Sequence, residues 1–335
     1  MSEIVTNRHD VYVLFDVTNG NPNGDPDAGN MPRIDPNTNC GIISDVCLKR
    51  KVRNYFEITT PARISPGDNG FKIIVHQGAV INDEITKGLN AAEDKVGKAT
   101  DKNEDKRAEE TMKWLCREFY DVRAFGAVLS TGAKDSIGKE PMKGSAWGQV
   151  RGPVQFTFSQ SFHAITPIEI TVTRCAVTKV EDKDKERTMG HKYIVPYALY
   201  AAKCYVSPAF AEKTGFTQVD LDLFFEALVE MFTHDRSAAR GEMIVRGIYD
   251  FEHVGTQHEN NAEQNKREAR LGCYHAHKLF DGINVALTEE AKKRGFPQGW
   301  NDYMTECLWA GKQKMPEGVR LHMRHEKPVQ TLPKS

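Results

Sequence analysis

The chain has 335 residues, 39% of them hydrophobic and 27% charged, so it can bury a substantial core as one large domain or two smaller ones. Its 45 Lys and Arg residues nearly cancel 46 Asp and Glu residues, so affinity for a polyanion must come from locally sorted charge. Seven cysteines without a C-x-x-C pair argue against a disulfide framework, and no segment is apolar enough to cross a bilayer. We therefore expect a cytoplasmic protein that is neither secreted nor bound to a membrane.

The N-terminal part combines a buried strand, a turn-rich loop and a basic helix. Residues 11–18 are largely apolar on both faces, which predicts a central strand. The loop that follows contains Asn19, Asn21 and Asn23 between glycines, and such loops can turn backbone N–H groups toward an anion. A helix with a plausible N-cap at Ser44 comes next. Its cations lie in one arc beside an apolar stripe, and they are Lys49, Arg50 and Arg53.

This order of strand, loop and basic helix predicts binding to a nucleic-acid backbone, because amides and cations would meet phosphates in one place. The alternative is an ordinary connection to an amphipathic helix with a solvated face.

The middle of the chain alternates between polar and strand-like segments. Residues 82–110 are charged and poor in large apolar side chains, which is typical of a solvated helical insertion or a partly disordered segment. A glycine-rich stretch, residues 138–152, carries Lys143 and Arg151. Alternating apolar residues then predict two half-buried strands, at 154–159 and 168–173.

A hairpin and a second basic loop follow. Residues 177–180 and 192–195 flank a turn that is too charged to be buried, so we expect a hairpin with a projecting tip. An amphipathic helix at 220–232 leads into a loop with Arg236 and Arg240 and then into a further strand. Four basic loops attached to one strand-rich core favour a groove for a polyanion.

Seven blocks of the sequence resemble one known family. They are residues 15–26 (FDVTNGNPNGDP), 43–53 (ISDVCLKRKVR), 121–126 (DVRAFG), 151–156 (RGPVQF), 189–192 (MGHK), 195–200 (VPYALY) and 235–241 (DRSAARG). Together they are similar to the backbone subunit of type I CRISPR effector (Cascade) complexes, of the I-C subtype in the RAMP superfamily. The resemblance covers residues 9–60 and 118–255 well and is thin elsewhere.

The resemblance implies an α+β fold with an RRM-like (ferredoxin-like) palm built on an antiparallel sheet. Residues 1–335 would form one domain, with a helical fingers insertion at about 61–117 and a protruding β-hairpin thumb at about 174–193. Residues 256–335 would complete the palm or the fingers. The aromatic signature of true RNA-recognition motifs is absent, so we expect recognition of backbone and shape rather than base stacking on the sheet.

The resemblance also implies a non-catalytic protein that binds guide RNA (crRNA) and polymerises head to tail into a helical filament for RNA-guided recognition of invading DNA. Its expected partners are the crRNA, target DNA through the guide, further copies of the chain, the guide-end-capping, large and small Cascade subunits, and indirectly a helicase-nuclease. We expect no cofactor, metal or membrane contact. The expected RNA-binding residues are Asn19, Asn21, Asn23, Ser44, Lys49, Arg50, Arg53, Lys143, Arg151, Arg236 and Arg240. The expected thumb residues are Arg174, Lys183, Lys185, Arg187, Met189, His191 and Lys192, with Met189 as a candidate apolar wedge.

Two other classes of function stay open. Asp16, Asp25, Asp27 and Asp35 crowd the first loop and would suit a metal-dependent endoribonuclease that cleaves guide-paired RNA, as in type III relatives, although the same residues are typical of turns. A free metabolic enzyme with a phosphate-bearing substrate is the third class. The segment 273–277 (CYHAH) lacks the ligand spacing of known metal sites, so we expect ordinary histidines there.

Overall fold

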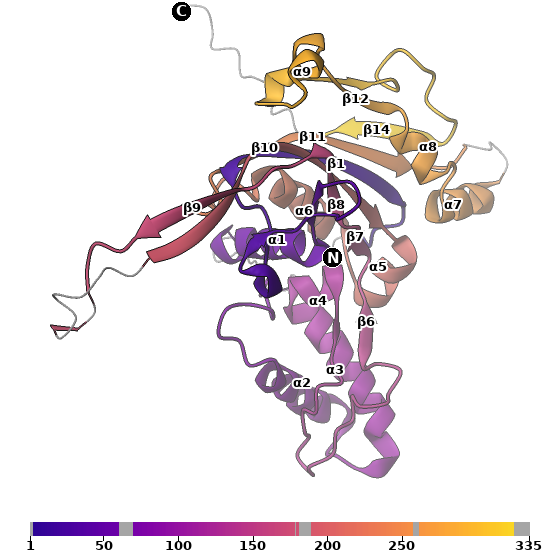
Figure 1. Cartoon of the computed structure of the whole chain (residues 1–335). Coiled ribbons are helices and arrows are strands. Elements are labelled where there is room, and N and C mark those ends of the chain that lie inside the picture. Colours follow the sequence, from indigo (N-terminus) through magenta and orange to yellow (C-terminus); the bar gives the residue numbers. More distant parts are fainter. Residues whose placement is uncertain (1–2, 60–69, 178, 181–188, 257–260, 325–335) are drawn as a thin grey trace, which may run out of the picture.

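The computed structural model describes residues 3–59, 70–177, 179–180, 189–256 and 261–324. It is a mixed α+β structure around one antiparallel sheet, with helices on one face, a C-terminal layer on the other, a helical projection and a long β-hairpin (Figure 1). Along its main path the sheet order is β14 (Val319–Met323), β11 (Glu242–His253), β1 (His9–Gly20), β10 (Met189–Val206), β8 (Ser159–Ala164) and β4 (Cys40–Ile43). The expectation that the first strand is central is confirmed, because β1 lies between β10 and β11.

The two faces of β1 belong to different cores, since successive side chains of a strand point to opposite faces. Val13, Phe15 and their neighbours face α1 (Asp45–Thr59) and α6 (Gln218–Glu230). On the opposite face, Tyr12 and Leu14 pack with the C-terminal layer. Burial on both faces explains why the strand has almost no polar alternation.

The strand expected at 154–159 is two strands. β7 (Val154–Phe156) and β8 are separated at residues 157 and 158, and Phe158 is 64% exposed although the alternating pattern placed it on the buried face. Both strands pair with β10, at different places along its length. The prediction of one continuous strand was therefore wrong.

The hairpin begins earlier than the sequence predicted. β9 (Ile168–Thr173) pairs with the first part of β10, from Ile168 opposite Ile194 to Thr173 opposite Met189. Residues 177 and 179–180, the expected first strand, belong to no strand. The alternating pattern at 168–173 was thus the true partner of the returning strand, and Figure 1 shows the resulting hairpin projecting from the sheet.

A helical projection lies beyond the helix-covered face of the sheet (Figure 1). Its helices α2 (Ile81–Val96) and α3 (Glu104–Glu118) pack around their own apolar cluster, which includes Leu89 and Leu115. Arg123, in α4 (Tyr120–Phe125), joins this projection to the helices under the sheet. Its guanidinium donates to both carboxylate oxygens of Asp220 in α6 and to carbonyl oxygens at the end of α3.

The C-terminal part covers the second face of the sheet and adds its edge strand β14. The layer contains α7 (Ala262–Leu271), α8 (Ala276–Phe280), β12 (Ile283–Leu287), α9 (Glu289–Arg294) and β13 (Tyr303–Cys307). β12 and β13 form a separate two-stranded sheet above the main one (Figure 1). Within the described parts of the chain, no helix has the length and apolar character needed to span a bilayer.

Asp250 fastens the edge strand to the sheet. This carboxylate is fully buried, lies 2.8 Å from Nδ1 of His9, and accepts a 2.8 Å hydrogen bond from Nε of Arg324 just beyond β14. Burial alone would favour the neutral acid, but His9 and Arg324 outweigh it and hold the pKa of Asp250 below its ordinary value. The edge therefore depends on a buried negative charge.

Candidate nucleic-acid interface

Three segments that the sequence singled out meet where β1 ends. Thr18 pairs with Tyr197 of β10 on one side and with Glu242 of β11 on the other, and Gly20 pairs with Val195. The hairpin begins directly before Val195, and the loop of residues 235–241 ends directly before Glu242. The turn after β1 therefore emerges between the hairpin base and the second basic loop.

Backbone contacts interlock the first turn with the loop of residues 235–241. The N–H of Asn21 donates to the carbonyl of Ala239 at 2.6 Å. Gly241 has φ +42°, and a Cβ there would lie 2.2 Å from the carbonyl oxygen of Asn19. A Cβ on Gly20 would lie 2.6 Å from the carbonyl oxygen of Arg240. Glycine is thus required on both sides of this contact, because no side chain fits between the two backbones.

The three predicted asparagines of the first loop comprise one exposed, one buried and one half-buried residue. Asn19 is exposed and left-handed, with φ 50°. Asn21 is 6% exposed and donates through its side chain to the carbonyl of Asn30 at 2.7 Å. Asn23 accepts hydrogen bonds from the N–H and the hydroxyl of Ser44, at 2.9 and 3.0 Å, which ties the loop to the start of α1. Among Asn19, Asn21 and Asn23, only Asn19 is exposed.

The exposed cations at this convergence come from two loops. Arg236 is exposed, and Arg240 is 39% exposed while its Nη1 lies 2.7 Å from Asp235. Arg33, from the far end of the first loop, is 37% exposed and pairs with Asp25 at 3.2 Å. No periodicity marks Arg33, so it was not among the predicted RNA contacts. We call Asn19, Arg33, Arg236 and Arg240 the turn surface.

A buried lysine supports this surface from below. Lys51 of α1 is 2% exposed and forms an ion pair with Asp235, the same carboxylate that holds Arg240. Burial lowers the pKa of Lys51, and the ion pair with Asp235 opposes that effect. Lys51 was not among the residues predicted to bind RNA. It anchors the second basic loop to α1.

The cationic arc of α1 is mostly turned inward. Lys49 and Arg53 are each 12% exposed, and they pair with Asp45 at 3.0 Å and with Asp121 at 2.8 Å. Both also lie over the ring of Phe125, at 5.9 and 5.3 Å from its centroid. These contacts make them packing partners between α1 and α4, and their contact with RNA stays a prediction.

Three further predicted RNA contacts lie outside the turn surface. Arg50 is half-buried and donates to the carbonyl of Val75 at 3.1 Å. Lys143 is 71% exposed and lies 3.1 Å from Glu140, while Arg151 is exposed at the end of β6 (Gln149–Arg151). β6 pairs with β5 (Gly126–Val128) and lies toward the helical projection in Figure 1. The structure does not bring these residues to the end of β1.

The hairpin exposes most of its predicted residues. Met189 is 65% exposed, His191 lies 2.7 Å from Glu169 across the ladder, and Arg174 and Lys192 are exposed. The remaining predicted thumb residues, Lys183, Lys185 and Arg187, lie outside the described residues.

The acidic residues near the first loop have local partners. Burial raises the pKa of Asp16, which accepts hydrogen bonds from Tyr197 and Arg246. Asp25 accepts from the N–H of Asp27, and Asp35 accepts from the backbone and side chain of the turn that follows it, which lowers its pKa. Among the described residues, no group of three His, Cys, Asp or Glu side chains is placed to hold a metal ion.

Comparison with known proteins places this architecture in a family. A curated relative from Haloferax volcanii, described as CRISPR-associated protein Cas7, is 28% identical over 222 residues, or 64% of this chain and 61% of the relative. The match thus spans less than two thirds of that relative. Among solved structures, a chain from a "CRISPR RNA-guided surveillance complex, pre-nicking" is 14% identical, with 73% of this chain and 78% of that chain covered and a TM-score of 0.45.

A second chain, from a "CRISPR RNA-guided surveillance complex", is 15% identical over 73% of this chain and 68% of its own length, with a TM-score of 0.41. The family model described as CRISPR-associated protein Cas7 matches residues 7–307, which is most of the sequence. This chain therefore belongs to the family of CRISPR-associated protein Cas7.

Proposed function

We propose that this protein binds guide RNA through the sugar-phosphate backbone, as a non-catalytic subunit of an RNA-guided surveillance complex. The observation that carries the proposal is the meeting of three segments at the end of β1: the first turn, the loop of residues 235–241 and the hairpin base. Membership of the Cas7 family supports the same assignment.

The turn surface suits phosphate rather than bases. Arg236 is exposed and has no anionic partner among the described residues, while Arg33 and Arg240 are partly exposed and each hold one carboxylate. A phosphate can take over Arg33 at small cost, because ion pairs at the surface contribute little. If Arg240 turned to a phosphate, Asp235 would keep its ion pair with Lys51. Contacts of this type carry no sequence information, so the bases stay free to pair with a target.

The predicted RNA contacts outside the turn surface would have secondary or indirect roles in RNA binding. Arg50 would extend the path of the strand along α1, and Lys143 and Arg151 would meet it only along the helical projection. Lys49 and Arg53 act first by fixing α1 against α4, so their effect on RNA would be indirect. Asn21, Asn23 and Ser44 would act by shaping the loop.

The sheet order supports an RRM-like palm within this proposal. The chain order β1, α1, β8, β10, α6, β11 with the spatial order β11-β1-β10-β8 matches the β-α-β-β-α-β arrangement of ferredoxin-like domains. In this assignment the helical projection of residues 81–118 serves as the fingers, and the hairpin of β9 and β10 serves as the thumb.

We assign the protein to the type I-C Cascade backbone, where copies would stack head to tail along one crRNA. A repeated heterologous contact produces an open helical array, so one RNA could carry several copies. The thumb of each copy would cross the crRNA strand next to the segment that the same copy binds. Exposed Met189 would act as an apolar wedge between bases. The capping, large and small subunits and a helicase-nuclease would complete the system.

The test removes the charge of the turn surface. In R33Q/R236Q/R240Q we expect weaker RNA binding for every guide sequence, and a salt dependence of log K that is shallower by about 2, from about 0.7 per lost phosphate contact on a single strand. The matched control is K87Q/K95Q/K113Q on α2 and α3, where each lysine is at least half exposed. An unchanged slope in the first variant, or an equal change in the control, would refute the assignment.

The non-catalytic assignment has a separate test. The assembled complex should leave guide-paired RNA intact with Mg²⁺ present, and Asp27→Ala should change nothing. Cleavage that Asp27→Ala or Asp35→Ala abolishes would instead favour the endoribonuclease class.

A further inference from the structure

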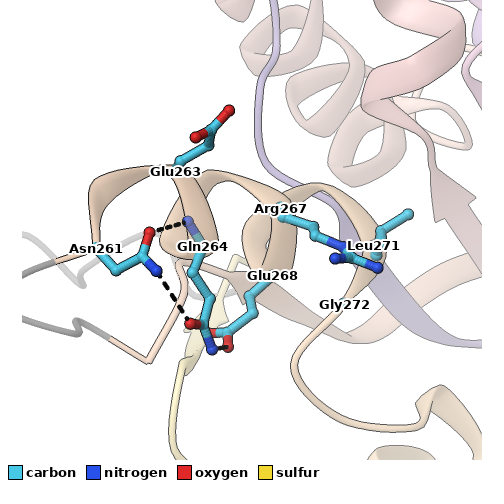
Figure 2. Close-up of a pocket in the computed structure, with 7 residues that line it drawn as sticks. All are labelled: Asn261, Glu263, Gln264, Arg267, Glu268, Leu271 and Gly272. Atoms are coloured by element: carbon cyan, nitrogen blue, oxygen red, sulfur yellow. Dashed lines mark hydrogen bonds between the residues drawn. The ribbon is translucent and has the colours of Figure 1, made fainter.

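Two adjoining hollows lie along α7 and α8, at the end of the molecule away from the hairpin (Figure 1). Their volumes are about 760 and 750 Å³, and they share Leu271 and Gly272. Figure 2 shows the first hollow, where Asn261, Gln264 and Glu268 bond to one another along α7. The polar side chains of these three residues are therefore already hydrogen-bonded to one another. We consider the second hollow the better candidate for binding a ligand.

The second hollow is lined by nitrogen-bearing and aromatic side chains. It contains Arg8, Tyr205, Tyr274, His275 and His277, and none of its described lining residues is acidic. The imidazole rings of His275 and His277 are exposed and stack with centroids 5.6 Å apart. Such a lining offers flat faces and hydrogen-bond donors in the same place.

Two lysines that are not among the lining residues lie near the aromatic side chains of this hollow. Nζ of Lys278 lies 5.7 Å from the ring centroid of Tyr274, and Nζ of Lys203 lies 5.6 Å from that of Phe280, which is 6.1 Å from Tyr205. Both lysines are exposed, and neither has an anionic partner among the residues that the structure describes. Arg8, by contrast, is already paired with Asp10 at 2.9 Å.

We propose that this second hollow, which we call the α8 surface, binds a single strand of nucleic acid other than the guide. Lys203 and Lys278 would contact phosphates while the exposed rings stack on bases, which is the combination that sequence-independent single-strand binding uses. An acidic protein would satisfy the lysines but would leave the aromatic faces without a function. The chemistry therefore favours a strand with both phosphates and bases.

The α8 surface is separate from the turn surface. Val195, beside the first turn, and Tyr205, in the hollow, are ten residues apart on β10, which corresponds to about 33 Å of extended strand. Guide binding and second-strand binding can therefore occur on one subunit at once, and each can be tested while the other is intact.

The experiment uses complex already loaded with guide RNA and a fluorescein-labelled dT12 probe, measured by anisotropy across a salt series. The variant K203Q/K278Q keeps the aliphatic stems over the rings and removes both charges. We expect about tenfold weaker probe binding at low salt and a slope that is shallower by about 1.4, from two contacts of about 0.7 each. The matched control K293Q/K314Q removes two exposed lysines outside the hollow and should bind like the wild type.

A further variant, Tyr274→Leu, keeps the charges and removes a stacking face, so it should weaken dT12 without changing the salt slope. Equal probe binding by K203Q/K278Q and the wild type would overturn the proposal. So would tighter binding of a labelled poly-glutamate peptide than of dT12, because the surface would then suit an acidic protein. Loss of guide loading in K203Q/K278Q would also overturn it, since the two surfaces would not be separate.

Discussion

Arg123 offers the sharpest test of how the helical projection is joined to the rest of the protein. The side chain is fully buried, and its donors reach Asp220 at 3.1 and 2.7 Å and three backbone carbonyls at 2.6 to 3.2 Å. Arg123→Met keeps much of the volume but leaves Asp220, which is almost fully buried, without a cation. Breaking a buried pair in this way costs about 3–5 kcal/mol, against about 5–15 kcal/mol for the stability of a whole domain.

The assay is urea unfolding of RNA-free protein, followed by tryptophan fluorescence, with the free energy of unfolding compared across a double-mutant cycle. Asp220→Asn keeps an acceptor for the helix cap at Thr217, so R123M/D220N should cost at least about 2 kcal/mol less than the sum of the single variants. Arg117→Met, at a half-exposed side chain, is the control and should change stability by less than about 0.5 kcal/mol. A cost below about 1 kcal/mol for Arg123→Met, or strict additivity, would refute the reasoning.

Three further predictions concern the turn surface and the sheet edge. Gly241→Ala should lower both stability and RNA affinity, because the added Cβ has no room. Gly299→Ala, with open space around it, should change neither. Equal effects of the two variants in urea unfolding and RNA titration would contradict this prediction. The double variant K49M/R53M should reduce stability but change the salt slope of RNA binding by less than about 0.3. A slope shallower by about 1.4 would instead show that both residues contact phosphates directly. Because the pKa of Asp250 is lowered in the fold, its charge contributes stability that is fully present above the ordinary pKa of about 3.9 and is lost as pH falls through the lowered value. The stability gap between wild type and Asp250→Asn should therefore narrow between pH 6 and pH 3, and a constant gap in urea midpoints would argue against that role.

Local sequence patterns correctly predicted the features that depend only on residues close together in the chain. The apolar stripe of α1, with Leu48, Val52 and Phe56, is buried, and the central position of β1 follows from its two apolar faces. Asp45 could also have been recognised as a partner of Lys49, since the two are four residues apart on one helix.

Long-range partners were beyond the reach of such patterns. Asp121 is 68 residues from Arg53 in sequence, and Asp235 is even farther from Lys51, so nothing local distinguishes a buried cation from an exposed one. The hairpin shows the same limit, because two alternating segments could pair with the returning strand and only the tertiary register selects 168–173. The sequence predicted the loops that meet at the candidate site, but not which of their cations face solvent.

The projecting hairpin and the sheet share one uninterrupted 18-residue strand, β10. Side chains of a strand alternate between its faces, so inserting one residue between Met189 and Ile194 would exchange the faces of every residue from there to the tip, while the rest of β10 kept its own. Two residues added to each arm would instead lengthen the hairpin by about 6.6 Å and preserve all orientations. We therefore expect the length of this hairpin to vary among related proteins in steps of two residues per strand.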